Sequence, residues 1–200
     1  MPLFPEFESL SEHDLRSLIL GQSPDGPEYE RVYIGELAHR IAASEEGIEF
    51  LHELAPKSGG QRLAGIIDGL ADVGDRIELP SMLLETIASE DEYVLISTLD
   101  AARFIRLALP FNRVRDLLDA HRSDFLLAAL HRYLAGMKSE DVIPELISAL
   151  SHQSPIVRQN AIDELADLNY QPAVSAIAGL LNDPDPQVRE AAQSALTSLV

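Results

Sequence analysis

The stretch that decides the fold is residues 154–161, SPIVRQNA, because it returns as residues 185–192, DPQVREAA. The two copies are offset by 185 minus 154, or 31 positions. Their apolar residues keep the spacing four, four and three: Val157, Ala161, Leu165 and Leu168 in the first copy, and Val188, Ala192, Leu196 and Leu199 in the second. This spacing places them on one face of an α-helix. Ser154 and Asp185 are good N-caps, and the proline after each suits a first helical position, so each copy predicts one helix.

Earlier copies of the same stripe extend the repeat toward the N-terminus. One step of 31 residues reaches Leu126, Leu130, Leu134 and Met137, opened by Ser123. The next step reaches Leu95 and Leu99 but then falls on Arg103 and Arg106, and a step of 32 reaches Leu63 and Ile67. Shorter helices are expected between these, beginning near Ser44, Pro80, Pro110, Asp141 and Gln171. Self-similarity at such a period indicates stacked helix pairs.

The final copy also carries a family resemblance. Residues 183–196, DPDPQVREAAQSAL, resemble the second helix of HEAT repeats, notably the short bacterial type named after phycobilisome lyases. The resemblance is good over residues 141–200, extends by register alone over 79–140, and scarcely covers 1–78. It implies a superhelix whose second helices line a concave binding face. It also implies that Arg158 and Arg189 occupy the family's arginine position, which is often paired with acidic groups of adjacent repeats.

Together these patterns predict an all-α fold, a right-handed α-α superhelix of the HEAT/armadillo-like solenoid type with about six helix pairs. Residues 1–43 are expected to form two N-terminal capping helices, at about 11–21 and 28–43, the first with a capping-box-like start. Residues 44–200 are expected to form one continuous solenoid domain. Gly65 and Gly69, four residues apart on one helix, predict a close contact between helices.

Composition excludes several classes of function. The chain has 15 basic and 33 acidic side chains, a net charge of −18, which disfavours nucleic acid and anionic membranes as partners. It has no cysteine, which fits a reducing compartment, so we expect a cytoplasmic protein. The start, MPLFPEFE, lacks the features of a signal peptide, and no apolar run is long enough for a membrane span.

The sequence also lacks the usual signals of catalysis. No nucleophile elbow, phosphate-binding loop or dinucleotide fingerprint occurs. A di-iron centre of the HEAT type would need several His-Glu dipeptides, and only His52-Glu53 occurs. The remaining histidines lack the spacing that aims two ligands at one metal ion, and we expect them to be surface or capping residues: His13, His39, His121, His131 and His152. We therefore predict a protein without catalytic residues, metal or cofactor.

Two candidate binding surfaces follow from the register and the charge distribution. Displacement from the apolar stripes places one set of residues on the concave face, where most are acids or hydrogen-bond acceptors: Asp100, Arg132, Gln159, Asp163, Glu190 and Gln193. The alternative is a basic patch between acidic ends: Arg103, Arg106, Arg113, Arg115 and Arg122, with Arg132 beside it. These arginines can equally be intramolecular counter-charges. Because burying bare guanidinium groups is costly, we expect the helix to rotate and leave Arg103 and Arg106 at its rim.

These observations support two functional hypotheses. The first is a scaffold or adaptor whose acidic surface binds a basic or helical protein segment, with an immunity-type inhibitor of a basic toxin as one form. The second, from the resemblance, is a phycobilin-lyase-type subunit that would handle a tetrapyrrole near Tyr93, Arg103, Phe104 and Tyr133. The last helix has no glycine C-cap and no polar capping helix after it. We therefore expect that it either packs against another molecule, as in self-association through the C-terminal helix, or belongs to a longer array.

Overall fold

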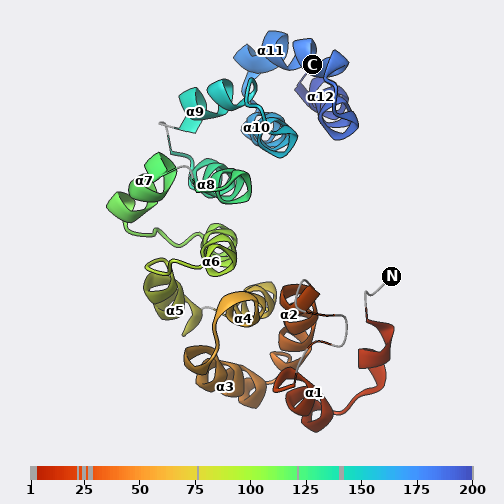
Figure 1. The fold of residues 1–200 in the computed structure, drawn as a ribbon, viewed down its shortest axis with the longest axis vertical. Coiled ribbons are helices and arrows are strands. Elements are labelled where there is room, and N and C mark those ends of the chain that lie inside the picture. Colours follow the sequence, from red (N-terminus) through yellow and green to blue (C-terminus); the bar gives the residue numbers. More distant parts are fainter. Residues whose placement is uncertain are drawn as a thin grey trace. The chain divides into compact units, whose positions relative to one another are not determined.

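The computed structural model of the chain describes residues 4–21, 23, 26, 29–75, 77–120, 122–139 and 142–199. All regular secondary structure within these residues is helical. Twelve α-helices lie within these residues, joined by short turns and 3-10 helices (Figure 1). The predicted all-α fold of about six helix pairs is therefore confirmed. The helices group into two compact units, residues 1–109 and 110–200, which are described separately.

Unit 1 begins with the 3-10 helix η1 (Pro5–Ser9) and continues with α1 (Glu12–Ile19), α2 (Glu30–Ile41), α3 (Glu45–Leu54), η3 (Ala55–Lys57), α4 (Gly60–Asp72), α5 (Leu79–Thr86) and α6 (Glu92–Ile105). Within this unit α4 packs between α2 and α6, so the three longest helices form one row. The predicted capping box is confirmed at α1, where Ser11 accepts from the backbone of Asp14 and the Asp14 carboxylate accepts from that of Ser11.

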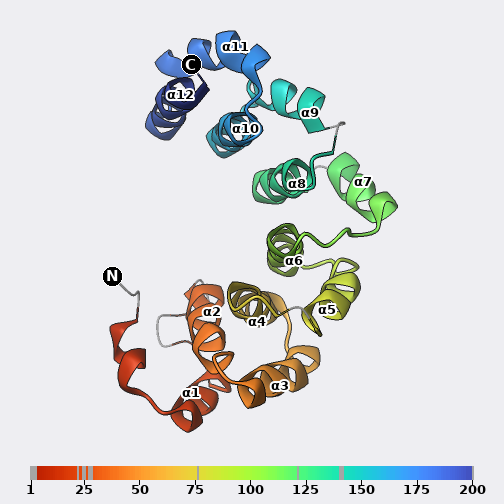
Figure 2. The same ribbon diagram turned by 180° about the vertical axis from the view of Figure 1, so that it is seen from behind.

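Unit 2 contains α7 (Phe111–Ala120), α8 (Asp124–Gly136), α9 (Val142–Ala149), α10 (Pro155–Asp167), η4 (Gln171–Ala173), α11 (Val174–Gly179), η5 (Leu180–Asn182) and α12 (Pro186–Leu199). Helix α10 packs between α8 and α12, so these three helices form one row. Both views show α7, α9 and α11 together along one side of this row (Figures 1 and 2). The stripe that defined the repeat is buried, with Val157, Ala161, Leu165, Val188 and Ala192 fully inaccessible. The helix start expected near Asp141 lies outside the described residues.

The long helices end in a shared way that fixes the true register of the repeat. Gly74, Arg106, Lys138 and Asn169 all have a positive φ, between 51° and 73°. After each of them the next backbone N–H donates to a carbonyl five residues back, as in Leu107 to Ala102 at 2.8 Å and Tyr170 to Leu165 at 3.0 Å. This is the hydrogen bond of a Schellman-type cap. The four caps are 32, 32 and 31 residues apart, so the repeat extends toward the N-terminus at least as far as α4.

These caps correct the register predicted for Arg106, whereas Arg103, which is partly exposed, corresponds in the new register to the buried Ala135. The step between α6 and α8 is 32 residues rather than 31, so Arg106 corresponds to Lys138 and not to a core residue. Helix α6 ends at Ile105, and Arg106 is exposed in the left-handed conformation. Arg106 therefore leaves the core because the helix stops, and no rotation of α6 is required.

Glycine at positions 65 and 69 makes the predicted close contact, which joins α4 to α2. A Cβ atom at Gly65 would lie 2.6 Å from the carbonyl oxygen of Arg31, and one at Gly69 would lie 2.5 Å from the Cβ of Ala38. Real Cβ atoms do not approach so closely, so only glycine allows this spacing of the two helices. One predicted cap is wrong: Ser154 occupies the N-cap position of α10, but its side chain makes no capping hydrogen bond.

Candidate functional site

Part of the predicted concave surface lies on α8, α10 and α12 in unit 2. Arg132 and Asp163 hold the same register position on neighbouring helices, as do Gln159 and Glu190, each pair 31 residues apart. Asp163 and Glu190 are exposed, whereas Arg132 and Gln159 are partly exposed. We call these four residues, together with the exposed Asp167 one turn beyond Asp163, the α10 face. Its charged groups are three carboxylates and one guanidinium.

Asp163 is the electrostatically unusual member of the α10 face. Partial desolvation by surrounding protein, and then the negative charge of Asp167, raise the pKa of the Asp163 carboxyl above its ordinary value. The side chain nevertheless stays exposed. On the neighbouring helix, Arg132 donates from Nη1 to Oδ1 of Asn160 at 3.4 Å. A cation placed beside Asp163 would therefore relieve an unfavourable charge.

The two other residues of the predicted set are Gln193 and Asp100. Gln193 is exposed, but its equivalent in the preceding repeat is Ile162, which is fully buried. Gln193 thus lies on the side of α12 where a following repeat would pack. Asp100 lies on α6 and belongs to unit 1.

The basic residues are divided between the two units. Arg103 and Arg106 are at the end of α6 in unit 1, whereas Arg113, Arg115 and Arg122 lie on or after α7 in unit 2. Arg115 lies 3.8 Å from Asp119, and Arg103, Arg113 and Arg122 also interact with other groups. In neither unit do these arginines form one cluster of cations that is left without interaction partners.

The arginine position implied by the resemblance connects adjacent repeats in unit 2. Arg158 donates from Nη1 to the carbonyls of His152 and Gln153, and from Nε and Nη2 to both carboxylate oxygens of Asp183, at 2.9 and 2.7 Å. The hydrogen bond from Arg158 makes the largest contribution to lowering the pKa of Asp183 below its ordinary value, and the backbone N–H of Asp185 adds to it. Both oppose the effect of burial, which raises this pKa. Arg189 makes the same pair of carbonyl contacts, to Asp183 and Pro184.

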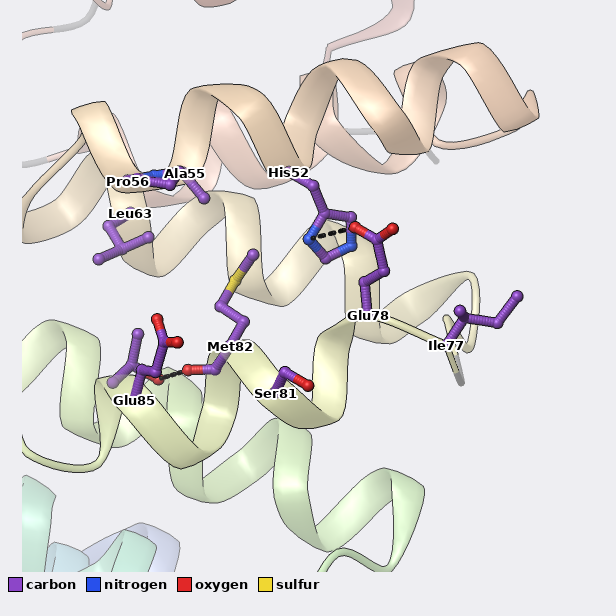
Figure 3. Close-up of a pocket in the computed structure, with 10 residues that line it drawn as sticks. His52, Ala55, Pro56, Leu63, Ile77, Glu78, Ser81, Met82 and Glu85 are labelled. Carbon is purple, nitrogen blue, oxygen red and sulfur yellow. Dashed lines mark hydrogen bonds and ion pairs between the residues drawn. The ribbon is translucent and has the colours of Figure 1, made fainter.

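A second site, not anticipated from the sequence, lies in unit 1 around His52 (Figure 3). Its side chain is 11% exposed, and Nε2 lies 2.6 Å from Oδ2 of Asp75, whose side chain is 4% exposed. His131 on α8, which was predicted to be a surface or capping residue, is buried at 1% exposure. Beside His52 is a cavity of about 430 Å³. Because His52 and Asp75 are 23 residues apart on different segments, no local pattern predicts their contact.

The four residues considered for a tetrapyrrole are divided between the units, with Tyr93, Arg103 and Phe104 in unit 1 and Tyr133 in unit 2. Tyr133 is 4% exposed and belongs to the core of unit 2. Tyr93 and Phe104 are exposed, but they lie near opposite ends of α6, a helix of 14 residues. Within the described residues no group of three or more histidine and acidic side chains is arranged to hold a metal ion. No helix there is long and apolar enough to cross a membrane.

The comparison with protein families agrees with this reading of unit 2. Residues 111–197 match the family model of HEAT repeats, in agreement with the resemblance found in the sequence. No curated protein matches the sequence.

Solved structures share the fold over nearly the whole chain. An engineered protein has 18% identity and a TM-score of 0.52, over 93% of this chain and 96% of that one. A designed armadillo repeat protein has 16% identity and a TM-score of 0.50, over 95% and 100%. A chain in the complex of CpcE and CpcF of phycocyanin lyase from Nostoc sp. PCC7120 has 14% identity and a TM-score of 0.53, over 96% of each. Likenesses at these identities establish a HEAT/armadillo-type repeat fold, and a fold alone does not define a reaction.

Proposed function

We propose that this protein is a non-enzymatic scaffold that binds a basic segment of another protein through the α10 face. The observation that carries the proposal is Asp163, an exposed carboxylate whose pKa is raised by desolvation and by Asp167. Its charge is unfavourable in the free protein, so a partner cation would bind where it relieves the most repulsion. An inhibitor of a basic protein is one form that such a scaffold takes, and the cytoplasmic location stays a prediction.

The surroundings of Asp163 support a protein partner over a small ligand. The α10 face spreads over three neighbouring helices, and helices packed in this way lie about 8 to 10 Å apart. Such spacing suits contacts with several residues of one segment. Gln159 and Arg132 add donors that can bind the backbone or acidic groups of that segment. The net charge of −18 would also accelerate the approach of a basic partner, in a salt-dependent manner.

We also propose that α12 supports self-association. Gln193 is exposed at a position that is buried one repeat earlier, and Arg189 keeps its carbonyl contacts but is paired with no carboxylate among the described residues. Both observations favour a second molecule packing there. Sedimentation equilibrium would detect the association, and an Arg189→Ala variant should shift it toward monomer. A chain that stays monomeric at the highest soluble concentration would contradict this part of the proposal.

The scaffold hypothesis is tested by reversing charge on the α10 face. The Asp163→Lys/Glu190→Lys variant should lose the natural partner, whereas Glu6→Lys/Glu8→Lys, which changes the net charge equally at exposed positions of unit 1, should retain it. Each protein is immobilised, incubated with lysate of the source cell, and the bound proteins are compared by quantitative mass spectrometry. The protein lost only with the first variant is then titrated at two salt concentrations, with circular dichroism as the folding control. Identical bound sets for both variants would refute the proposal.

A further inference from the structure

The cavity beside His52 is a groove between α3 and α5 of unit 1. Helix α3 with η3 forms one wall, α5 forms the other, and Leu63 of α4 lies between them (Figure 3). Its volume of about 430 Å³ lies in the range of ligand-binding pockets. Pro56, Leu63 and Met82 supply apolar surface, and Met82 points from α5 across the groove. The groove therefore has room for one sizeable apolar side chain.

Carboxylates occupy both ends of this apolar surface. Glu78, the N-cap residue of α5, and Glu85 are seven residues apart, which places them along one side of the helix at a separation of about 10 Å, two helical turns. Figure 3 shows Glu78 beside His52 and Glu85 toward the other end, with Met82 between them. The side chain of Glu78 is 59% exposed, and Glu85 is exposed. Both carboxylates are thus accessible to a molecule lying along the groove.

Hydrogen bonds to the nearly buried carboxylate of Asp75 fix the shape of the groove. The carboxylate of Asp75 accepts from the backbone N–H groups of Ile77, Glu78 and Leu79 at 2.9 to 3.3 Å, which fixes the start of α5. Burial opposes ionisation of Asp75, but the hydrogen bond from His52 and those from the backbone outweigh it and lower the pKa of this carboxyl. His52 therefore donates from Nε2 to an ionised Asp75, and its Nδ1 lies 3.6 Å from Oε2 of Glu78. A preformed site of this kind loses little entropy on binding.

We propose that this groove is a second docking site, which binds an extended protein segment in which two basic residues flank an apolar one. The apolar side chain packs against Met82, Leu63 and Pro56, and the two cations pair with Glu78 and Glu85. Side chains two residues apart on an extended segment point to the same side, so a basic-x-apolar-x-basic pattern matches the order of groups in the groove. Unit 1 as a whole has 8 basic and 21 acidic side chains, a net charge of −13, which favours such a partner. The site goes beyond the proposed function because it uses no residue of the α10 face.

The test is a titration of the protein with the acetylated, amidated peptide Lys-Ser-Leu-Ser-Lys, monitored by NMR with methionine methyl labelling. Binding should shift the Met82 methyl signal. The Glu78→Gln/Glu85→Gln variant should bind about fivefold more weakly, the effect of two solvent-accessible ion pairs. Glu6→Gln/Glu8→Gln, with the same net charge, should bind as the parent does. Equal weakening of both variants would show unspecific attraction to an acidic protein and would overturn the proposal.

The apolar contribution is tested separately. A Met82→Ser variant should weaken binding of the leucine peptide about threefold, the effect of a partly buried apolar contact. The same change should leave the weaker binding of Lys-Ser-Ser-Ser-Lys unaltered. Equal effects on both peptides would overturn the proposal, and so would butylammonium binding as tightly as the leucine peptide, because the groove would then be a site for small cations. All of these variants retain the α10 face, so their outcome is independent of the proposed function.

Discussion

In unit 1, helices α2 and α4 meet through glycine, whereas in unit 2, helices α10 and α12 are connected by an arginine that reaches the loop of the next repeat. The first contact depends on the absence of side chains at Gly65 and Gly69. The second depends on Arg158, which binds two carbonyls of its own loop and the carboxylate of Asp183. The same helix stacking is therefore stabilised by packing in one place and by a buried ion pair in the other.

Unit 1 also has an arginine–aspartate pair between its long helices, and the comparison shows what burial adds. Arg31 on α2 binds Asp68 on α4 through Nε and Nη2, at 2.7 and 3.2 Å, so the geometry resembles that of Arg158 and Asp183. However, the side chains of Arg31 and Asp68 are 26% and 31% exposed, against 11% and 5% for the pair in unit 2. Water competes for the first pair much more than for the second.

The largest effect is expected where glycine sets the helix spacing. The Gly65→Ala/Gly69→Ala variant should lose about 4 kcal/mol of unfolding free energy, because each inserted methyl group costs about 1 to 3 kcal/mol in a space that is already filled. Gly179→Ala is the matched control, since no atom lies within 4 Å of its added Cβ, and helix propensity should make it neutral or slightly stabilising. Urea unfolding measures both. Similar stabilities for the two variants would show that α2 and α4 are not packed through glycine.

The next effect separates the two ion pairs. Asp183→Ala leaves a nearly buried guanidinium without its carboxylate and should cost about 3 kcal/mol. Asp68→Ala removes the same contact from a partly exposed arginine and should cost about 1 kcal/mol or less. Chemical unfolding at constant pH gives both values. Equal losses would mean that burial does not distinguish the two pairs.

These differences also explain how far sequence reasoning succeeds. The stripes from Leu126 to Leu199 recur because every repeat of unit 2 solves the same packing problem, so periodicity alone places α8, α10 and α12. The predicted offset to α6 is wrong by one residue, because the step from the cap at Arg106 to the cap at Lys138 is 32 residues and the following step is 31. No glycine marks these helix ends in the sequence, since Arg106, Lys138 and Asn169 adopt the left-handed conformation instead. A non-glycine residue can adopt this conformation when the surrounding hydrogen bonds fix it.

The candidate sites differ in the same way. Gln159, Asp163 and Glu190 could be placed on one surface because their register follows directly from the repeat. The groove in unit 1 could not, since the contact of His52 with Asp75 depends on how the turn before α5 folds back toward α3. The spacing of Glu78, Met82 and Glu85 on α5 is visible in the sequence, but acids at that spacing are common on exposed helices.

A smaller effect is expected from acid, and it involves one buried carboxylate in each unit. The pKa values of Asp75 and Asp183 are lowered from 3.8 by folding, so the folded protein binds these protons less strongly than the unfolded chain. Their contribution to stability is fully present above pH 3.8 and is lost as the pH falls through the lowered pKa values. The melting temperature of the parent should therefore fall as the pH decreases from about 5 to 3, and Asp75→Asn and Asp183→Asn should each flatten part of this slope. Circular dichroism melts measure it, and unchanged slopes would contradict the assignment.

The smallest effect has the opposite sign and concerns Asp163. Because its pKa is raised in the folded protein, the folded state binds this proton more strongly than the unfolded chain. Stability is therefore lost as the pH rises from 3.8 through the raised pKa, and at neutral pH the ionised side chain is destabilising. Asp163→Asn should raise the melting temperature slightly at pH 7 but not below pH 3.8, where Asp163 is protonated in both states. Asp116→Asn, an exposed change on α7, serves as the control and should change neither value.

If Asp163→Asn stabilises the free protein and also weakens its binding to the partner, the carboxylate lowers stability in exchange for recognition, a compromise that is common at binding surfaces. A variant less stable than the parent at pH 7 would instead show that Asp163 stabilises the fold, and the α10 face would lose its main support as a binding site.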